Sequence, residues 1–532
     1  MSVLDKNASG RETHEIDLSF QTALMKWNTK SPYSWKPWVC AAVVLLAFFF
    51  RVHGLGAESL WLDEGITVQQ VRSSFREMMA TLMYGDVQPP LYYLILKLWT
   101  VLFGTSEIAV RFPSVVFGTL SVWMVYRIAR LCFEDEYVGL LTALIVAFSE
   151  FHIRYSQESR NYSLLALLSL CSYYYYVKLL RERTRGILVR YILFSSLLMY
   201  THVYGSFIVI SQNIYFLARR LAKNDPHRLS WKHWALSQGT LGFLFLPWFV
   251  VWALYLLSVG RKIDLFHMPG PTLLTILNTF GVYSGSAPLL LLCALLVPFA
   301  FVTHESQKSE AGFHWTSVKN FMGRLSLSSG PDRNVMLFAW LLTPIVLPFL
   351  ISQVLTPFYG FRYTIGGSFA FYLLVAAGMR NLRDNRLILT TVVCFCVLSS
   401  QSILGYYTQS NKEQWRVVAG FVDAQAKPGD LLLFNAGYTL PAVFDYYSKR
   451  TDTIKRAVPS DLDTEALREL ALLAEEHNRV WLILSHSSDT ERLVEKALLQ
   501  TYRLVCRRKY YSVSHTGHSK YVGVELLLFE KP

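Results

Sequence analysis

Charged residues are scarce in this chain of 532 residues. Asp, Glu, Lys and Arg together make up 17% of it, against about 25% in a typical soluble domain. Hydrophobic residues make up 52%. This composition excludes a disordered chain, a coiled coil and an ordinary soluble enzyme. A polytopic α-helical membrane protein is the class that remains.

Several motifs with specific chemistry are also missing. The seven cysteines include no Cys-x-x-Cys pair, and the chain has no glycine-rich phosphate loop and no Gly-x-Ser-x-Gly motif. These absences speak against a zinc site, a nucleotide-binding fold and a hydrolase nucleophile. We therefore expect no nucleotide cofactor and no disulfide framework.

Long apolar runs are what the chain has instead. A helix needs about 20 apolar residues to cross the hydrocarbon layer of a bilayer, and about eleven runs have this length or approach it. A further run at 91–103 is too short to cross and is typical of an interfacial or re-entrant helix. The spanning runs are 37–50, 111–131, 137–152, 163–180, 187–203, 205–221, 235–258, 286–303, 335–354, 362–379 and 387–406.

The net charge of +13 could indicate a nucleic-acid-binding protein, but its distribution indicates membrane topology. Alternate connecting segments differ consistently in their content of Lys and Arg, as the positive-inside rule requires. The predicted inner segments hold about three times as many of these residues as the outer ones. We therefore expect no nucleic-acid partner. The inner segments are 1–36, 127–136, 178–190, 219–233, 304–334 and 380–386.

The predicted alternation of inner and outer segments divides the chain into three parts. Residues 1–36 are predicted to be a cytoplasmic tail, and residues 37–406 the transmembrane domain, whose first outer loop is 52–110. Residues 407–532 are close to neutral and change character, with strand-like runs and helices of amphipathic spacing. They predict a small α/β domain on the same side of the membrane as the outer loops.

The first outer loop carries an adjacent carboxylate pair, Asp63 and Glu64. At a membrane surface such a pair can accept a proton from a hydroxyl group or hold a cation. The alternative is a loop acid that caps the next helix, because carboxylates favour helix N-termini. Asp86 lies just before Gln88, a Pro-Pro turn and Tyr92, and by itself is more typical of a turn.

Other polar residues gather in the remaining outer loops. Arginines suit phosphate, because one guanidinium group can bind two oxygens, although an arginine that extends to lipid headgroups is the simpler explanation for any one of them. A single histidine after an apolar helix is usually a hydrogen-bonded core residue. The residues concerned are Gln157, Glu158, Arg160, Tyr162, His202, Arg362 and Tyr363.

Together these segments resemble the GT-C superfamily of membrane glycosyltransferases, in particular the bacterial family 39-like enzymes. Those enzymes are related to protein O-mannosyltransferases, the lipid A aminoarabinose transferase and rhizobial lipopolysaccharide-core transferases. The similarity covers most of residues 45–440, and the order and shared side of the motifs make it fairly specific. The motifs are Trp61–Gly65, Pro89–Tyr93, Arg111–Ser114, Tyr155–Tyr162, Tyr200–Gly205, Arg362-Tyr363 and Lys412–Arg416.

The resemblance implies a transferase in a bacterial plasma membrane, with the N-terminus in the cytoplasm and the small domain outside. The implied donor is a polyprenyl-phosphate sugar, and the acceptor is a hydroxyl group of a lipid, a glycan or a protein. Asp63 would be the general base, with Glu64 beside it in the catalytic motif. Arg160 and Arg362, with Tyr162 and Tyr363, would bind the donor phosphate.

The substrate-positioning residues implied in the same way are Gln88, Tyr92, Gln157 and Glu158. Many relatives have His where this chain has Gln88, and an amide is a poor ligand for transition metals. A divalent cation bound through oxygen ligands, with Asp86 and His202 as candidate ligands, and a metal-free site both stay open.

Two other functions compete with this one. A lipid-glycan flippase would carry ionisable groups along a path across the bilayer, whereas here they gather at one face. A ligase or polymerase that uses a diphosphate-linked glycan differs only in its donor, and the sequence separates it poorly from the first hypothesis.

Overall fold

A computed structural model gives the fold of most of the chain. The predicted cytoplasmic tail, except for its last two residues, and Asp86 lie outside the described part. The structure describes residues 35–85, 88–221, 230–259, 270–301, 333–354, 357–382, 384–459, 462–486, 489, 491–513 and 520–532.

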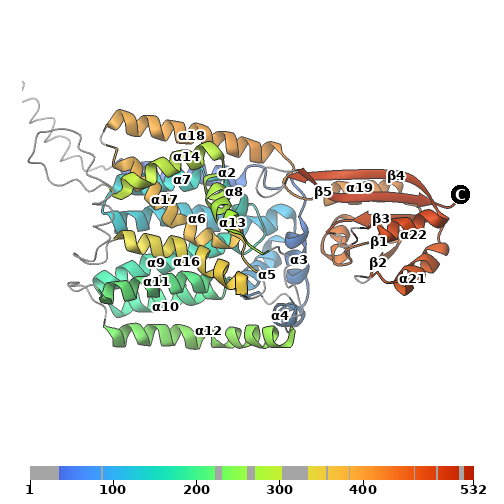
Figure 1. The fold of residues 1–532 in the computed structure, drawn as a ribbon, viewed down its shortest axis with the longest axis horizontal. Helices are drawn as coiled ribbons and strands as arrows, with labels where there is room; N and C mark the ends of the chain where they lie inside the picture. The colour runs from blue at the N-terminus through green and yellow to red at the C-terminus, as the bar shows by residue number, and fades with distance from the viewer. Residues whose placement is uncertain are drawn as a thin grey trace, which may run out of the picture.

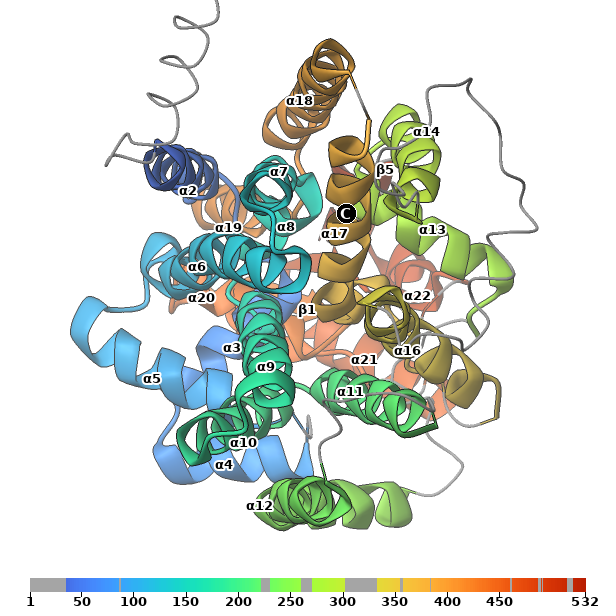
Figure 2. The same ribbon diagram turned by 90° about the vertical axis from the view of Figure 1, so that its left-hand side faces the viewer.

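Long helices lying side by side form the main body of the molecule (Figure 1). In the view along the bundle, α9 and α17 lie inside it and α12 and α18 lie at its rim (Figure 2). Each of the eleven predicted apolar runs contains helix. The helices are α2 (Lys36–Val52), α6 (Glu107–Phe133), α7 (Glu136–Ala147), α9 (Tyr162–Glu182), α10 (Arg185–Met199), α11 (Tyr204–Leu221), α12 (Trp231–Val259), α14 (Ala287–Leu296) with η2 (Val297–Phe301), α16 (Arg333–Val354), α17 (Ile365–Arg380) and α18 (Asn385–Thr408).

Not all of these helices are long and apolar enough to cross a membrane by themselves. Among the described residues five meet that test, namely α6, α9, most of α12, α16 and α18, and up to seven do if each of two bent helix pairs counts as one span. Helices α2, α10, α11 and α17 fall outside it. The helical bundle is thus confirmed, whereas the count of about eleven crossings stays a prediction.

Shorter helices join the bundle helices. Three of them, α3, α4 and α5, lie at the end of the bundle that faces the C-terminal domain (Figure 1). The run predicted to be too short to cross is α5. The short helices are α3 (Leu62–Arg72), α4 (Phe75–Tyr84), α5 (Leu91–Phe103), α8 (Glu150–Ser156), α13 (Leu273–Ser284) and η3 (Phe361–Thr364).

The C-terminal part contains a five-stranded sheet of order β2-β1-β3-β5-β4. Strands β2, β1 and β3 are parallel, and β5 pairs antiparallel with β3 and with β4. The small α/β domain is therefore present. Its elements are α19 (Trp415–Gln425), β1 (Leu431–Phe434), η4 (Leu440–Phe444), α20 (Asp445–Tyr447), β2 (Ile454–Ala457), α21 (Thr464–Glu475), β3 (Arg479–Leu484), α22 (Leu493–Thr501), β4 (Arg503–Val513) and β5 (Lys520–Glu530).

Both faces of this sheet are covered. Side chains alternate between the faces of a strand, so Leu432 and Phe434 of β1 join one apolar cluster and Leu431 and Leu433 join another. The first cluster includes residues of α19, and the second includes residues of α21 and α22. This two-sided burial explains why β1 and β3 are almost entirely apolar in sequence.

The small domain packs directly on the start of α3. A side chain at Gly65 would place its Cβ 2.5 Å from the carbonyl oxygen of Ala442, so only glycine permits this close approach of α3 to η4. Beside it, the hydroxyl of Tyr447 accepts a hydrogen bond of 2.6 Å from the N–H of Leu60. The acidic motif is therefore covered by the C-terminal domain.

Candidate active site

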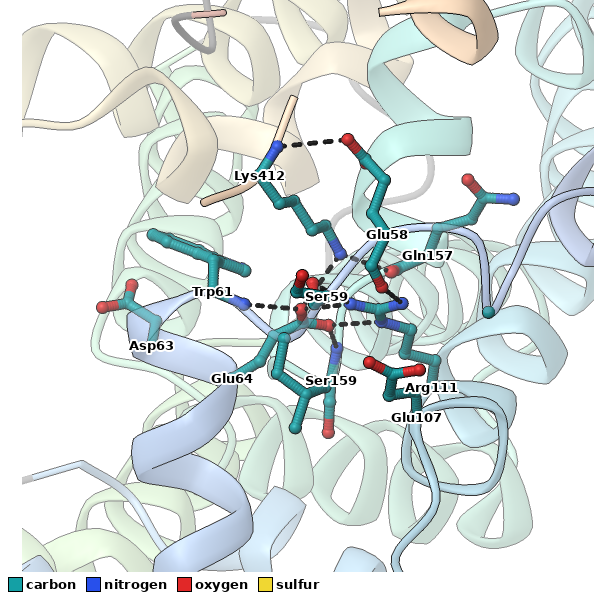
Figure 3. A network of polar contacts seen from close by, with 12 residues as sticks. Glu58, Ser59, Trp61, Asp63, Glu64, Glu107, Arg111, Gln157, Ser159 and Lys412 are labelled. Carbon is teal, nitrogen blue, oxygen red and sulfur yellow. Dashed lines mark hydrogen bonds and ion pairs between the residues drawn. The ribbon is translucent and has the colours of Figure 1, made fainter. Parts of the chain in front are cut away.

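The acidic motif forms the first turn of α3. Trp61 precedes the helix in an extended conformation, and its N–H lies 3.4 Å from Oε2 of Glu64, which caps the start of this helix. Consecutive residues of a helix do not share a face. Asp63 and Glu64 therefore point in different directions, and Figure 3 shows Asp63 directed away from the contacts of Glu64.

Glu64 is fully buried and both of its carboxylate oxygens are occupied. Arg111 binds it with two hydrogen bonds of 2.8 and 2.7 Å, in the paired geometry that favours arginine over lysine. The ammonium group of Lys412 lies 3.1 Å from Oε2, and the N–H of Ser159 donates to Oε1 at 2.9 Å. We call Glu64, Arg111, Lys412 and Ser159 the closed cluster (Figure 3).

The closed cluster keeps Glu64 charged. Burial alone would raise the pKa of Glu64, but the charges of Arg111 and Lys412 and the hydrogen bonds lower it to about 2. A carboxylate with this pKa and no open oxygen is a poor proton acceptor near neutral pH. The geometry therefore supports a structural role for Glu64 rather than the predicted catalytic one.

Asp63 lies in a more open cluster. Its side chain is 25% exposed, and its Oδ2 lies 3.6 Å from Nη1 of Arg362 and 4.0 Å from Nη2 of Arg160. Arg160 is held in place by hydrogen bonds to the carbonyl oxygen of Asp63 and to the hydroxyl of Thr67. We call Asp63, Arg160 and Arg362 the open cluster; it brings together three residues that are far apart in the sequence.

Aromatic rings surround Arg362. Its guanidinium carbon lies between 5.2 and 5.8 Å from the ring centres of Trp61, Tyr162 and Tyr363. Nη2 also donates to the hydroxyl of Tyr363 at 3.3 Å. These contacts fix the cation without neutralising it. Both tyrosines predicted to bind the donor are thus next to the predicted phosphate-binding arginine.

His202 adjoins the same group. It is buried, its Nδ1 accepts a hydrogen bond from the N–H of Tyr204 at 3.1 Å, and its ring centre lies 4.9 Å from that of Tyr363. Burial and the charges of Arg160 and Arg362 lower the pKa of His202 to about 3, so its imidazole is neutral. A neutral imidazole can bind a metal.

A metal site with Asp86 and His202 stays a prediction. Asp86 lies outside the described residues, and the part of the chain that the structure describes has no group of three or more His, Cys, Asp or Glu side chains that could hold a metal ion.

The predicted positioning residues of the second outer loop are buried. Gln157 donates to the carbonyl oxygens of Arg51 and His53 and accepts from Tyr406 at 2.9 Å, so it joins α2 to α18. Glu158 is 1% exposed, and its Oε2 has no hydrogen-bond partner. Burial raises the pKa of Glu158 to about 7, although the charge of Lys412 opposes that rise. Gln157 is thus engaged in the fold, whereas Glu158 is a buried carboxyl with an open oxygen.

Gln88 and Tyr92 lie at the start of α5. Gln88 is half-buried before the two prolines, the second of which is the N-cap of α5. Tyr92 is buried, and its hydroxyl lies 3.4 Å from Ser114 and 3.5 Å from Ser159. Tyr92 therefore reaches the backbone segment that binds Glu64, and no described contact joins Gln88 to Asp63.

Sequence reasoning missed two residues that order the site. Arg111 and Lys412 both occur in motifs that support the resemblance, but their pairing with Glu64 spans 47 and 348 positions of sequence. A buried arginine near the start of a spanning helix is costly unless it is paired. The position of Arg111 in a predicted spanning helix therefore indicates that it needs an acidic partner.

The fold is shared with solved structures of ArnT from Cupriavidus metallidurans. The apo structure matches with a TM-score of 0.57 and 13% identity over 95% of this chain and 98% of ArnT. The structure of ArnT bound to undecaprenyl phosphate matches with the same TM-score and 14% identity, over 93% of this chain and 98% of ArnT. This likeness shows that the chain shares its fold with ArnT.

Two sequence comparisons narrow the class. Residues 87–252 match the family described as dolichyl-phosphate-mannose-protein mannosyltransferase. An uncharacterized protein of Aquifex aeolicus (strain VF5) is 25% identical over 229 residues, which make up 41% of this chain and 43% of that protein. The match thus spans less than half of that relative's length. In this region and in its fold, the chain is similar to the GT-C superfamily of membrane glycosyltransferases.

Proposed function

We propose that the protein transfers a sugar from a polyprenyl-phosphate carrier to an acceptor hydroxyl group at the extracytoplasmic face of a bacterial plasma membrane. The observation that carries this proposal is the open cluster, in which a partly exposed carboxylate lies beside two guanidinium groups. A proton acceptor and a phosphate-binding pair are the two parts that such a transfer needs. One of the structures with this fold, that of ArnT, contains undecaprenyl phosphate.

The proposed reaction is a direct displacement at the anomeric carbon. The acceptor oxygen attacks that carbon while Asp63 takes the hydroxyl proton. The bond between the anomeric carbon and the phosphate oxygen breaks, and its electron pair stays on the phosphate. Sugar transfer thus leaves a glycosylated acceptor, a polyprenyl phosphate and one proton on the carboxyl group.

The arginines of the open cluster stabilise the departing phosphate. Arg362 and Arg160 are fixed before substrate arrives, by aromatic rings in one case and by hydrogen bonds to α3 in the other. Preorganised cations lower the energy of a charge that develops in the transition state, because no reorientation is needed at that moment. Tyr162 and Tyr363 line the same position and can contact the donor sugar or phosphate.

The proposed sidedness follows from the position of the small domain. Asp63 belongs to the first turn of α3, which lies at the end of the bundle that faces this domain (Figure 1), and the distribution of Lys and Arg predicts that end to be outside. Nucleotide sugars are not normally supplied there, so a lipid-linked donor suits the location. The N-terminal tail would then lie in the cytoplasm.

The test uses the full chain in lipid nanodiscs. A panel of polyprenyl-phosphate sugars is supplied together with a bacterial envelope extract that contains lipids, glycans and proteins, and released polyprenyl phosphate is measured for the wild type and for Asp63→Asn. The wild type should release the carrier from at least one donor, and the variant should not. EDTA and Mg²⁺ arms test whether a divalent cation takes part.

Two results would overturn the proposal. Release by Asp63→Asn at the wild-type rate would remove the assigned base. Absence of release from every donor by folded wild-type protein would favour a diphosphate-linked donor or a transport function, and a liposome flipping assay would separate those two.

A further inference from the structure

The small sheet has a topological switch point between β1 and β3. These strands are adjacent and parallel, but the chain leaves β1 toward β2 on one side and leaves β3 toward β4 and β5 on the other. In open α/β sheets, ligands bind at the carboxyl ends of the strands on either side of such a point. The carboxyl ends of β1 and β3 are followed by Asn435 and by Ser485-His486.

Asn435 presents an unused hydrogen-bond acceptor at this edge. The residue is 7% exposed, and its side-chain Oδ1 is buried with no hydrogen-bond partner. Its backbone N–H continues the sheet by donating to the carbonyl oxygen of Ile483 at 3.2 Å. A buried amide oxygen without a donor is costly, so the position is explained by a donor that is supplied from outside the chain.

His486 is held at the same edge in a specific orientation. Its Nε2 hydrogen-bonds and ion-pairs with Oε1 of Glu413. Glu413 is 2% exposed and is fixed in turn by Nε1 of Trp415, which donates to its other oxygen at 2.7 Å. The backbone of His486 is left-handed, with φ at +51°. Non-glycine residues adopt this conformation mainly where the surroundings impose it, and it is concentrated at functional sites.

This edge of the sheet faces the acidic motif. The segment that follows β1 is η4, which contacts Gly65. The charge of Asp63 also acts on His486: burial alone would lower the pKa of His486, but the hydrogen bond to Glu413 and the charges of Glu413 and Asp63 raise it above its ordinary value. The imidazole therefore lies within electrostatic reach of the proposed base.

We propose that Asn435 and His486 form an acceptor-binding subsite that holds a carbohydrate next to Asp63. The imidazole, whose Nε2 is held by Glu413, hydrogen-bonds to one sugar hydroxyl group through its other nitrogen, and the amide oxygen of Asn435 accepts from a neighbouring hydroxyl group. A sugar ring carries both kinds of group on adjacent carbons. The subsite rests on the proposed function and narrows its acceptor from a lipid, glycan or protein hydroxyl to a glycan hydroxyl.

The experiment compares three variants of the full chain in nanodiscs. His486→Gln and Asn435→Leu remove the two proposed contacts. His477→Gln is the matched control, because His477 lies before β3 at the opposite edge of the same sheet, where its Nδ1 contacts the carbonyl oxygen of Gly429. The envelope extract is separated into glycan, protein and simple lipid fractions, and each fraction serves as the acceptor and as the titrant in a direct binding measurement.

Both test variants should bind the glycan fraction at least tenfold more weakly than the wild type. Their KM for that fraction should rise about tenfold while the KM for the donor lipid stays within twofold. His477→Gln should match the wild type. A rise in the KM for the glycan without a rise in the KM for the donor indicates a binding role. A loss of folding would instead impair the use of both substrates.

Several results would overturn the subsite. They are unchanged glycan binding in both variants, equal losses for donor and acceptor, and transfer to the protein or simple lipid fraction alone. If no donor is consumed by the wild type, the proposed transferase fails, and glycan binding still decides the subsite: binding that depends on His486 supports it, and absence of binding refutes it.

Discussion

The closed cluster and the open cluster begin at adjacent residues of one helix and differ in almost every physical respect. Glu64 is fully buried and accepts five hydrogen bonds on its two oxygens, whereas the side chain of Asp63 is a quarter exposed and meets its arginines only at 3.6 and 4.0 Å. The closed cluster joins the outer loop, the bundle and the small domain. The open cluster leaves both its carboxylate and its guanidinium groups able to contact a substrate.

The difference shows how one acidic pair can serve structure and chemistry together. The saturated residue fixes the first turn of α3, and that turn then positions its neighbour. A group held by strong partners loses reactivity, because its proton affinity falls and its contacts cannot be exchanged. Substitutions within or beside one cluster at a time therefore separate the two roles.

Glu64→Gln breaks the closed cluster and should have the largest effect. It leaves Arg111 and Lys412 buried without their counter-charge, which typically costs about 3–5 kcal/mol. We expect a lower thermal transition in nanodiscs and little folded protein at 37 °C. Glu134→Gln is the control, because the carboxylate of Glu134 is 74% exposed and pairs with Arg181 at the surface, where such a pair contributes at most about 1 kcal/mol. Equal stability of Glu64→Gln and Glu134→Gln would contradict the structural role of Glu64.

Glu158→Gln tests the carboxyl that lies beside the closed cluster. The folded-state pKa of about 7 is above the 4.5 of a free Glu side chain, so the folded protein binds this proton more tightly than the unfolded chain does. Its contribution to stability is therefore complete below about pH 4.5 and declines as the pH rises toward 7. Between pH 5 and 8 the wild type should lose roughly 2–4 kcal/mol relative to Glu158→Gln. If the free energy of unfolding changes with pH in the same way in both proteins, the raised pKa of Glu158 is contradicted.

Arg362→Gln removes one phosphate-binding group from the open cluster. We expect transfer to fall by roughly 10²-fold, mostly in kcat, because the cation acts on the charge of the departing phosphate. Folding should be preserved, since the side chain of Arg362 is 18% exposed and its partner Asp63 is not buried. Arg72→Gln is the control, because Arg72 is an exposed arginine in the last turn of α3 that contacts Thr105. A change in transfer of less than threefold for Arg362→Gln would contradict the phosphate role.

Gly65→Ala alters the packing between the two domains and should have the smallest effect. Its Cβ would lie 2.3 Å from Val443 and 2.5 Å from the carbonyl oxygen of Ala442, so α3 and η4 must separate slightly. We expect a cost of about 1–3 kcal/mol and faster proteolysis after Thr408. Gly420→Ala in α19, where a Cβ meets nothing within 4 Å, should instead be neutral or stabilising. Equal resistance of Gly65→Ala and Gly420→Ala to protease would contradict the role of Gly65 in the packing of α3 against η4.

The sequence predicted those parts of the fold that follow from local pattern. Run length and hydropathy located a helix at every predicted apolar run. Strand β2 has no strand-like pattern in the sequence because half of it is polar: Lys455 and Arg456 lie on an edge strand, where no apolar alternation is required.

For the candidate site, the sequence predicted which residues lie on the same side of the membrane, but not which of them contact one another. The topology placed Asp63, Arg160 and Arg362 on one face, and the structure brings their side chains together. The sequence could not show that Glu64 is saturated with partners while Asp63 is open. That difference depends on Lys412, which is 348 positions away from Glu64. His486 was missed for the same reason: a histidine in a loop of the small domain has no local feature that links it to α3.

The most direct test measures donor binding and turnover separately in Asp63→Asn. Removing this carboxylate takes away the proton acceptor but leaves Arg160 and Arg362 free to bind phosphate. The variant should therefore bind a polyprenyl-phosphate sugar as tightly as the wild type or more tightly, while carrier release falls by about 10²–10⁴-fold. Turnover within tenfold of the wild type, or donor binding lost together with turnover, would contradict the division of roles between the open and closed clusters.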